Sequence, residues 1–313
     1  MLTSWRNSIA SAGRAWRTGL TLALSLACPS AASAQDDGAR LYMIVPDQTT
    51  IASLRLHLLH SNVASDEGTV NEDNDLDTKL GVFQFVQALR FGSNQGFIFL
   101  VVPASHIAAN DVTNGVTGFG DAQLGFVYGV HGTPALKPAA YADHPPGLAV
   151  NLLAKLFFPT GKYSSARSVN VGANRWALRL GVPVVYAMGE RMADPHLTTV
   201  EAMPTVTFYS PNHDPVGAER TKQKPLFIFE GHLTRGFTRD FWASIDLLWR
   251  EGGEVIVDGL AAHNRQSALS LGATGTIALP ANLSLRLSAG KVVARNVHGP
   301  DGWMLRTIIG TVF

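Results

Sequence analysis

Apolar and polar residues alternate along most of the chain from residue 50 onward. Between residues 146 and 158, for example, Leu148, Val150 and Leu152 share one face, while Asn151 and Lys155 occupy the other. Successive side chains of a β-strand point to opposite faces, so the pattern predicts strands with one apolar face. Twelve segments show it: residues 50–60, 81–92, 96–103, 118–130, 146–158, 174–188, 197–209, 225–235, 239–250, 266–279, 282–294 and 302–313.

The predicted strands are longer than those of most soluble proteins. Most span 11 to 15 residues, whereas globular strands usually have about 5–6 and a tilted membrane-crossing strand needs about 9–11. Several end in aromatic residues, such as Phe158, Tyr186 and Trp249, as in the aromatic girdles of outer-membrane barrels. We therefore predict an all-β fold, a transmembrane antiparallel up-and-down β-barrel of about 12 strands over residues 49–313. A soluble β-sandwich is the alternative, because it alternates in the same way.

The connections between the predicted strands alternate between short and long. If the first strand runs outward, the periplasmic links are residues 93–95, 131–145, 189–196, 236–238 and 280–281. Four of these links are short, and the external loops are mostly long, as outer-membrane barrels require. The link 131–145 is the long exception, and we expect it to be ordered on the periplasmic side.

The N-terminal residues have the features of an export signal. Arg6, Arg14 and Arg17 precede a short apolar run at residues 19–27, and the small residues Ala32 and Ala34 flank Ser33. This arrangement predicts a cleaved signal peptide at residues 1–34. We expect residues 35–48 to be a periplasmic N-terminal segment, and the sequence leaves open whether residues 40–48 fold into the barrel as a plug. We expect the chain to reside in the bacterial outer membrane.

Composition and charge narrow the possible functions. The chain has 46% apolar and 16% charged residues and a formal net charge of +1, which becomes −2 when the three arginines of the signal peptide are removed. No global basic field exists, so we expect no nucleic-acid partner. The single cysteine, Cys28, lies in the predicted signal peptide, which argues against a disulfide framework or a multi-cysteine metal site. We expect neither a metal nor another cofactor.

An ordered set of short motifs resembles one family of outer-membrane proteins, named for the MetA pathway of phenol degradation. The motifs are residues 118–121 (GFGD), 158–163 (FPTGKY), 171–176 (VGANRW) and 209–212 (YSPN). The resemblance implies a monomeric transporter-like β-barrel that takes up small hydrophobic or aromatic molecules. Phe313 ends an amphipathic last strand. This resembles the signal that hands such barrels to the outer-membrane assembly machinery, which we therefore expect to be a partner.

If the apolar faces contact lipid, the opposite faces line the barrel lumen and carry charges of both signs. The lumen-lining candidates are Arg55, His57, Arg90, Asp121, Lys155, Arg175, Arg179, Glu201, Glu230, His232, Asp246, Arg286 and Arg306. They either pair and fill the lumen or line a polar pathway. Unpaired charge is costly in a low-dielectric interior, so we expect pairing in both cases.

Aromatic residues on the inner faces could bind an apolar solute. The apolar ligand candidates are Phe97, Phe99, Phe157, Tyr209 and Trp242. Ligand pockets are mostly apolar with a few placed polar groups, so we expect a passive channel for small hydrophobic or aromatic molecules. A plugged structural or surface-binding barrel without transport activity is the alternative.

A third, weaker hypothesis is an outer-membrane lipid hydrolase. His213 lies in a sequence context that resembles the catalytic histidine of such enzymes, but Pro215 stands where the nucleophilic serine is needed. A histidine needs its serine within hydrogen-bond reach. We therefore expect no enzymatic activity and name no catalytic residue.

Overall fold

The computed structural model describes residues 37–63, 70, 76–109 and 115–313, all within a unit that spans residues 31–313. The predicted signal peptide lies outside the described residues, as do residues 64–69 and 71–75 of the loop after the first strand. One short helix, α1 (Pro138–Ala142), accompanies 17 strands in this part of the chain. No helix among the described residues has the length and apolar character needed to cross a membrane.

The strands follow the predicted segments closely. They are β1 (Thr50–Ser61), β2 (Leu76–Phe91), β3 (Asn94–Ala109), β4 (Val116–Phe119), β5 (Gln123–His131), β6 (Leu148–Phe157), β7 (Ala177–Gly181), β8 (Val184–Met188), β9 (Thr198–Tyr209), β10 (Thr221–Gln223), β11 (Leu226–Gly236), β12 (Phe241–Gly252), β13 (Val255–Val257), β14 (Leu260–Ala261), β15 (Gln266–Leu279), β16 (Leu283–Arg295) and β17 (Gly302–Val312).

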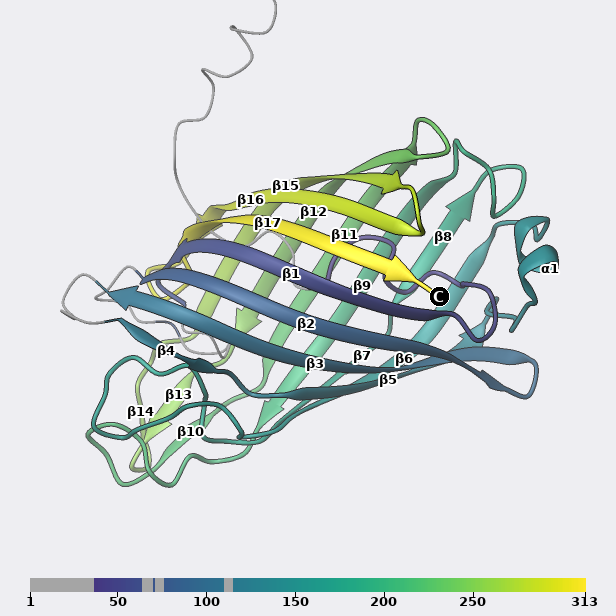
Figure 1. Cartoon of the computed structure of the whole chain (residues 1–313). Coiled ribbons are helices and arrows are strands. Elements are labelled where there is room, and N and C mark those ends of the chain that lie inside the picture. Colours follow the sequence, from purple (N-terminus) through teal and green to yellow (C-terminus); the bar gives the residue numbers. More distant parts are fainter. Residues whose placement is uncertain (1–36, 64–69, 71–75, 110–114) are drawn as a thin grey trace, which may run out of the picture. The chain divides into compact units, whose positions relative to one another are not determined.

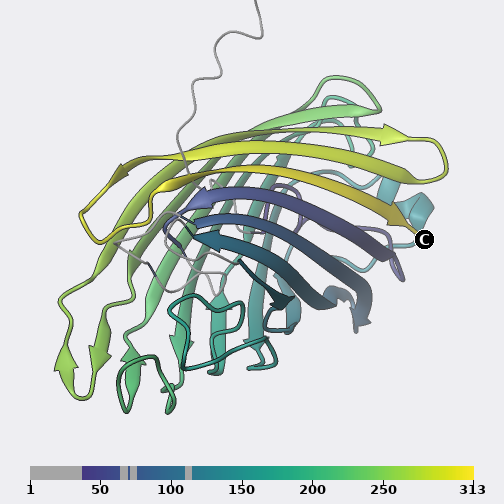
Figure 2. The ribbon, with the colours of Figure 1, turned by 60° about the vertical axis from the view of Figure 1, so that its left-hand side comes forward.

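Antiparallel pairing closes these strands into a barrel. Each wall strand pairs with its neighbours in sequence, and β1 pairs with β17 from Ile51 opposite Val312 to Ser61 opposite Gly302. The result is a closed antiparallel barrel of 12 strands, in which β4 with β5 and β7 with β8 each act as one wall strand. Closure removes the exposed sheet edges that an open sheet would present. Figures 1 and 2 show the tilted strands side by side.

Two predicted strands are interrupted, each for a local reason. The segment 118–130 breaks between β4 and β5, where Gly120 donates its backbone N–H to Pro103 of β3. The segment 174–188 breaks between β7 and β8 at Pro183, which has no backbone N–H to donate to a ladder. The carbonyl of Pro183 still accepts a hydrogen bond from the backbone N–H of Asn151 on β6, so the chain between β7 and β8 stays paired with the neighbouring wall strand.

The apolar faces point outward. Large apolar side chains such as Leu56, Leu152 and Ile245 are about half or more exposed, whereas their polar sequence neighbours are buried inside the barrel. A soluble sandwich would show the reverse arrangement. The fold and this exposed apolar surface agree with a location in the outer membrane, as predicted.

Most of the long connections lie at one end of the barrel, and the short ones lie at the other end together with the long link after β5 (Figure 1). The external end carries the small sheet of β10, β13 and β14. At the periplasmic end the long link after β5 is ordered, as expected. It includes α1, and Met192 and Ala193 of the next periplasmic link donate backbone N–H groups to His144 and Ala142.

Candidate functional site in the barrel lumen

Residues 37–48, which precede β1, lie inside the barrel. Ala39, Tyr42 and Ile44 are buried, and their partners are inward-facing residues of β3, β6 and the wall strands opposite. We call residues 37–48 the inserted segment. The sequence suggested that residues 35–48 form a periplasmic segment. From Asp37 onward the structure instead places this stretch in the lumen, because its polar groups find buried partners there.

An ion pair fixes the beginning of the inserted segment. Lys155 of β6 donates to Asp37 with a distance of 2.8 Å between Nζ and Oδ1, and both side chains are buried. The hydroxyl of Tyr42 donates to the other carboxylate oxygen at 2.7 Å. Burial alone would raise the pKa of Asp37, but the charges of Lys155 and Arg179 outweigh it and hold that pKa below its ordinary value of 3.8.

Two glutamates of the wall bind the backbone of the inserted segment. The carboxylate of Glu230 accepts the N–H groups of Asp37 and Gly38, each at 3.0 Å, and Glu201 accepts that of Arg40 at 2.8 Å. Hydrogen bonds to a carboxylate are stronger than those between neutral groups. The inserted segment is therefore held through its backbone as well as through Asp37.

The far end of the inserted segment is held at the periplasmic mouth. The side-chain amide of Gln95 makes two hydrogen bonds with the backbone of Val45. Its oxygen accepts the N–H of Val45 at 3.0 Å, and its nitrogen donates to the carbonyl of Val45 at 2.6 Å. Asp47 donates its backbone N–H to Leu136 and pairs with Arg90 at 2.6 Å. The inserted segment thus crosses the periplasmic half of the lumen.

Apolar contacts fill the space around the inserted segment. Tyr42, Met43 and Ile44 join a buried cluster that includes Phe97 and Phe99 of β3. On the opposite wall, two guanidinium groups lie over the ring of Trp242, with Arg40 at 4.7 Å and Arg286 at 4.9 Å from the ring centre. Arg286 also donates to the carbonyl of Ala39 at 3.0 Å.

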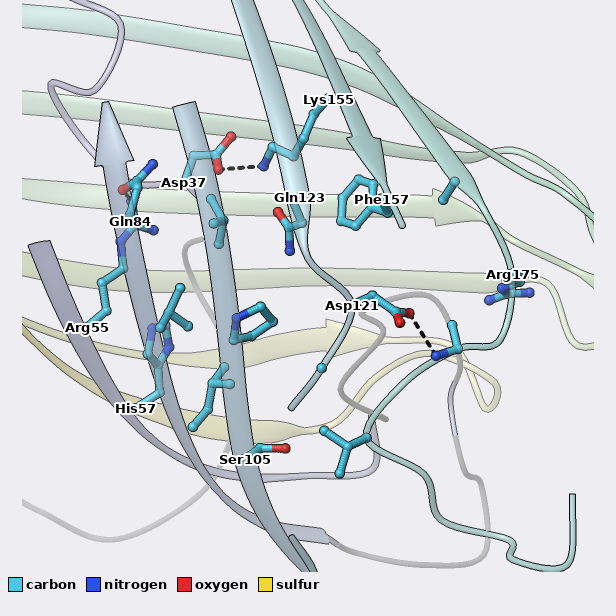
Figure 3. A pocket seen from close by; sticks show the side chains of 18 of the residues that line it. Asp37, Arg55, His57, Gln84, Ser105, Asp121, Gln123, Lys155, Phe157 and Arg175 are labelled. Atoms are coloured by element: carbon cyan, nitrogen blue, oxygen red, sulfur yellow. Dashed lines mark hydrogen bonds and ion pairs between the residues drawn. The ribbon is translucent and has the colours of Figure 1, made fainter. Parts of the chain in front are cut away.

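A cavity of about 90 Å³ lies in the lumen between the inserted segment and the external loops (Figure 3). Side chains from β1 and β2 line one side, including Arg55, His57 and Gln84. Phe157 of β6 and Tyr209 of β9 line the other side, and the Asp37–Lys155 pair lies at its inner end. The cavity therefore combines charged, polar and aromatic groups.

Asp121 positions the loop at the external rim of this cavity. Its two carboxylate oxygens accept the backbone N–H groups of Gly161 at 2.7 Å and Ala173 at 2.8 Å. Three of the sequence motifs therefore meet in space. The side chain of Asp121, in the motif 118–121, binds the backbone of the motifs 158–163 and 171–176. Turn chemistry at Pro159 and Gly161 supports the same loop.

A buried group of titratable side chains lies on β11 and β12. The imidazole of His232 lies with Nδ1 at 2.6 Å from Asp246 and Nε2 at 3.1 Å from Glu230. Ser244 and Thr274 donate hydroxyl hydrogen bonds to Asp246. The expected pairing of lumen charges is confirmed for these residues.

The structure brings most sequence-predicted residues into the lumen. Twelve of the thirteen lumen-lining candidates face inward at the depth of the inserted segment or the cavity: Arg55, His57, Asp121, Lys155, Arg175, Arg179, Glu201, Glu230, His232, Asp246, Arg286 and Arg306. Arg90 instead lies at the periplasmic rim, where its side chain is 44% exposed. The structure does not test the functional role of any of them.

The five apolar candidates also lie inside the barrel, but in three places. Phe157 and Tyr209 line the cavity, Phe97 and Phe99 pack against the inserted segment, and Trp242 lies beneath Arg40. Phe313 is largely exposed, and its backbone N–H donates to Thr50. Its role in assembly stays a prediction.

Sequence reasoning missed several residues of the site. Asp37, Arg40 and Tyr42 precede the first strand, outside any alternating pattern. Gln95 and Ser105 are inward positions of β3, both buried. Their positions could have been inferred, because alternate residues of a strand face the same side and Phe97, Phe99 and Val101 are the inward residues of the same strand.

Comparisons with known proteins agree with this architecture. A family model described as "Putative MetA-pathway of phenol degradation" matches residues 60–307. Among solved structures, an outer-membrane channel from Pseudomonas putida F1 matches with 20% sequence identity and a TM-score of 0.73, covering 89% of this chain and 100% of that one. The β-domain of the Bordetella autotransporter BrkA matches with 10% identity and a TM-score of 0.51, covering 85% and 100%. A search of curated proteins gives no match.

Proposed function

The chain belongs to the family named for the MetA pathway of phenol degradation, and on that basis we propose that it is a passive outer-membrane channel for small hydrophobic or aromatic molecules. The observation that carries this proposal is the lumen cavity lined by Phe157 and Tyr209 beside a few polar side chains. Binding sites for small molecules typically have this mixture of apolar surface and placed polar groups.

The inserted segment defines what transport would require. A solute that enters from the external loops reaches the cavity first and then meets the Asp37–Lys155 pair. To continue to the periplasm, the solute must pass the inserted segment, which is tied to Glu230 and Gln95. We infer that transport involves a transient displacement of the inserted segment, while the barrel wall keeps its pairing.

A plugged barrel without transport activity is the second candidate. The observation that favours it is the number of buried anchors on the inserted segment, from Glu230 and Lys155 at one end to Gln95 at the other. In that case the inserted segment would serve only to stabilise the barrel, and the external loops would carry any binding function.

Uptake measurements separate the two candidates. Proteoliposomes with lipopolysaccharide in their outer leaflet and the purified barrel should take up radiolabelled toluene or phenol faster than the same liposomes without the barrel, with no added energy source. The lipopolysaccharide is needed because a plain phospholipid bilayer does not hold back such solutes. A strain that lacks the gene should also grow more slowly on limiting concentrations of such compounds. Equal uptake by loaded and empty liposomes across a panel of aromatic solutes would reject the channel and favour the plugged barrel.

A further inference from the structure

One cation in the lumen cavity has no carboxylate partner among the described residues. Arg55 of β1 is only 9% exposed, and its guanidinium donates to the neutral amide oxygen of Gln84. Its neighbours in register are Val82 on β2 and Ile308 on β17, neither of which carries a charge. A buried charge without a counter-ion is costly, so this position favours an anion supplied from outside.

The carboxylates that line the same cavity are already engaged. Asp37 pairs with Lys155 and accepts the hydroxyl of Tyr42. Asp121 accepts two backbone N–H groups of the external loop. Neither one is therefore available as a counter-ion for Arg55.

Two further polar groups that line the same cavity, one on β1 and one on β3, have no hydrogen-bond partner among the described residues. Arg55 Nε, His57 Nε2 and Ser105 Oγ are all buried without a partner, and all three residues line the cavity (Figure 3). Arg306 lies opposite His57 in register on β17 and adds positive charge to this side of the lumen. Leaving a buried donor unpaired costs about 1–3 kcal/mol, which a bound acceptor would offset.

The opposite side of the cavity is aromatic. Phe157 and Tyr209 contribute their rings there, with the guanidinium groups of Arg179 at 5.4 Å and Arg175 at 4.5 Å from the respective ring centres. Val82 of β2 and Val101 of β3 add aliphatic surface to the wall between the two sides. The cavity volume of about 90 Å³ limits the occupant to a small molecule. An occupant that satisfies both sides therefore carries a negative charge at one end and a single ring at the other.

We propose that Arg55, His57 and Ser105 bind the carboxylate of a small aromatic acid, whose ring packs against Phe157 and Tyr209. The proposal rests on the proposed function in that it names the class of solute the channel takes. It adds to the proposed function a requirement for a negative charge on the solute, because a channel for neutral hydrocarbons needs no cation at this position. An arginine–carboxylate contact is charge-assisted and can be bidentate, which gives both strength and orientation.

Titration calorimetry on the purified full-length barrel in detergent tests the site directly. The probes are benzoate, its neutral analogue benzyl alcohol, and acetate, which has the carboxylate without the ring. The wild-type barrel should bind benzoate at least about tenfold more tightly than either of the others, since one charge-assisted hydrogen bond has about that effect. Equal affinity for benzoate and benzyl alcohol, or for benzoate and acetate, would overturn the proposal.

Variants connect the binding to the named residues. In Arg55→Met the preference for benzoate over benzyl alcohol should fall to about one, and Arg55→Lys should restore part of it. Ser105→Ala should weaken benzoate binding severalfold and gives a second test if Arg55→Met does not fold. Arg235→Met is the matched control, because Arg235 is an exposed arginine that contacts Thr198 at the periplasmic rim. An unchanged preference in folded Arg55→Met would refute the site.

The proteoliposome assay keeps this proposal separate from the proposed function. If neutral aromatic solutes cross the barrel but benzoate shows no Arg55-dependent binding, the channel stands and the acid site falls. If benzoate binds through Arg55 but no solute crosses, the acid site stands and the channel falls.

Discussion

Lys155 Nζ lies 2.8 Å from Asp37 Oδ1, and this contact joins the inserted segment to the barrel wall at the inner end of the lumen cavity. The lysine lies near the end of β6, whereas the aspartate precedes the first strand. Because both side chains are buried, neither charge can be satisfied by bulk water when the other is removed. The pair is therefore the natural place to test whether the inserted segment closes the lumen.

Removing one partner of this pair should loosen the inserted segment. In Lys155→Met the buried carboxylate of Asp37 loses the cation that donates to it and keeps only the charge of Arg179 nearby. Removing one partner of a buried pair typically costs about 3–5 kcal/mol. We expect larger and more frequent conductance steps in planar bilayers than for the wild type. Asp143→Asn is the matched control, because Asp143 lies outside the inserted segment, both it and its partner Arg191 are more than half exposed, and such surface pairs contribute about 0–1 kcal/mol. Identical conductance in Lys155→Met and the wild type would show that the pair does not hold the lumen closed.

The same pair predicts how closure depends on pH. The pKa of Asp37 is lowered from 3.8 because Lys155 and Arg179 outweigh the effect of burial. A lowered pKa means that the stabilisation is fully present above about pH 3.8 and is lost as the pH falls through the lower value of the docked state. We expect the difference in conductance between the wild type and Asp37→Asn to stay constant from pH 7 to about pH 4 and to shrink below that. A difference that already disappears between pH 7 and pH 5 would contradict this assignment.

A close contact between neighbouring strands explains one glycine of the barrel wall. Phe99 on β3 lies opposite Gly125 on β5 in register, and a Cβ at Gly125 would overlap the phenyl ring. Gly125→Ala should therefore destabilise the barrel by about 1–3 kcal/mol, the usual cost of overpacking. Urea titrations in phospholipid vesicles can measure this change. In a double-mutant cycle, the loss should be smaller when Phe99→Leu is also present, and strict additivity would argue against the contact.

The twelve wall strands were predictable because lipid on the outer face and polar contacts on the inner face impose period-two alternation along each strand. Leu152 and Asn151 on β6 show this plainly, since the first is exposed and the second is buried. The interruptions were harder to predict. The alternation of apolar and polar residues continues through Pro183. The only sign of the break between β7 and β8 in the sequence is therefore that this residue has no backbone N–H.

The site was predictable in part. Inward parity on a predicted strand identified Arg55, Lys155 and Phe157 as lumen residues, because the fold sets which face points inward. The sequence left the insertion of residues 40–48 open, because Asp37 and Tyr42 belong to no regular element. Their partners Lys155 and Asn151 are more than 100 residues away in sequence. Sequence periodicity carries no information about contacts of that kind.

The outward orientation of the apolar faces gives the last prediction. Ile245 on β12 is 67% exposed, and its neighbour Asp246 is buried in the lumen. On a lipid-facing position near the bilayer midplane, a lysine costs about 2–4 kcal/mol, whereas on the surface of a soluble protein the same change is close to neutral. We expect Ile245→Lys to lower the stability of the vesicle-inserted barrel in urea titrations by an amount in that range. Leu260→Lys is the matched control, because Leu260 is 77% exposed but lies in β14 of the external loops. Equal and small effects of both substitutions would argue that lipid does not cover the outer face of β12.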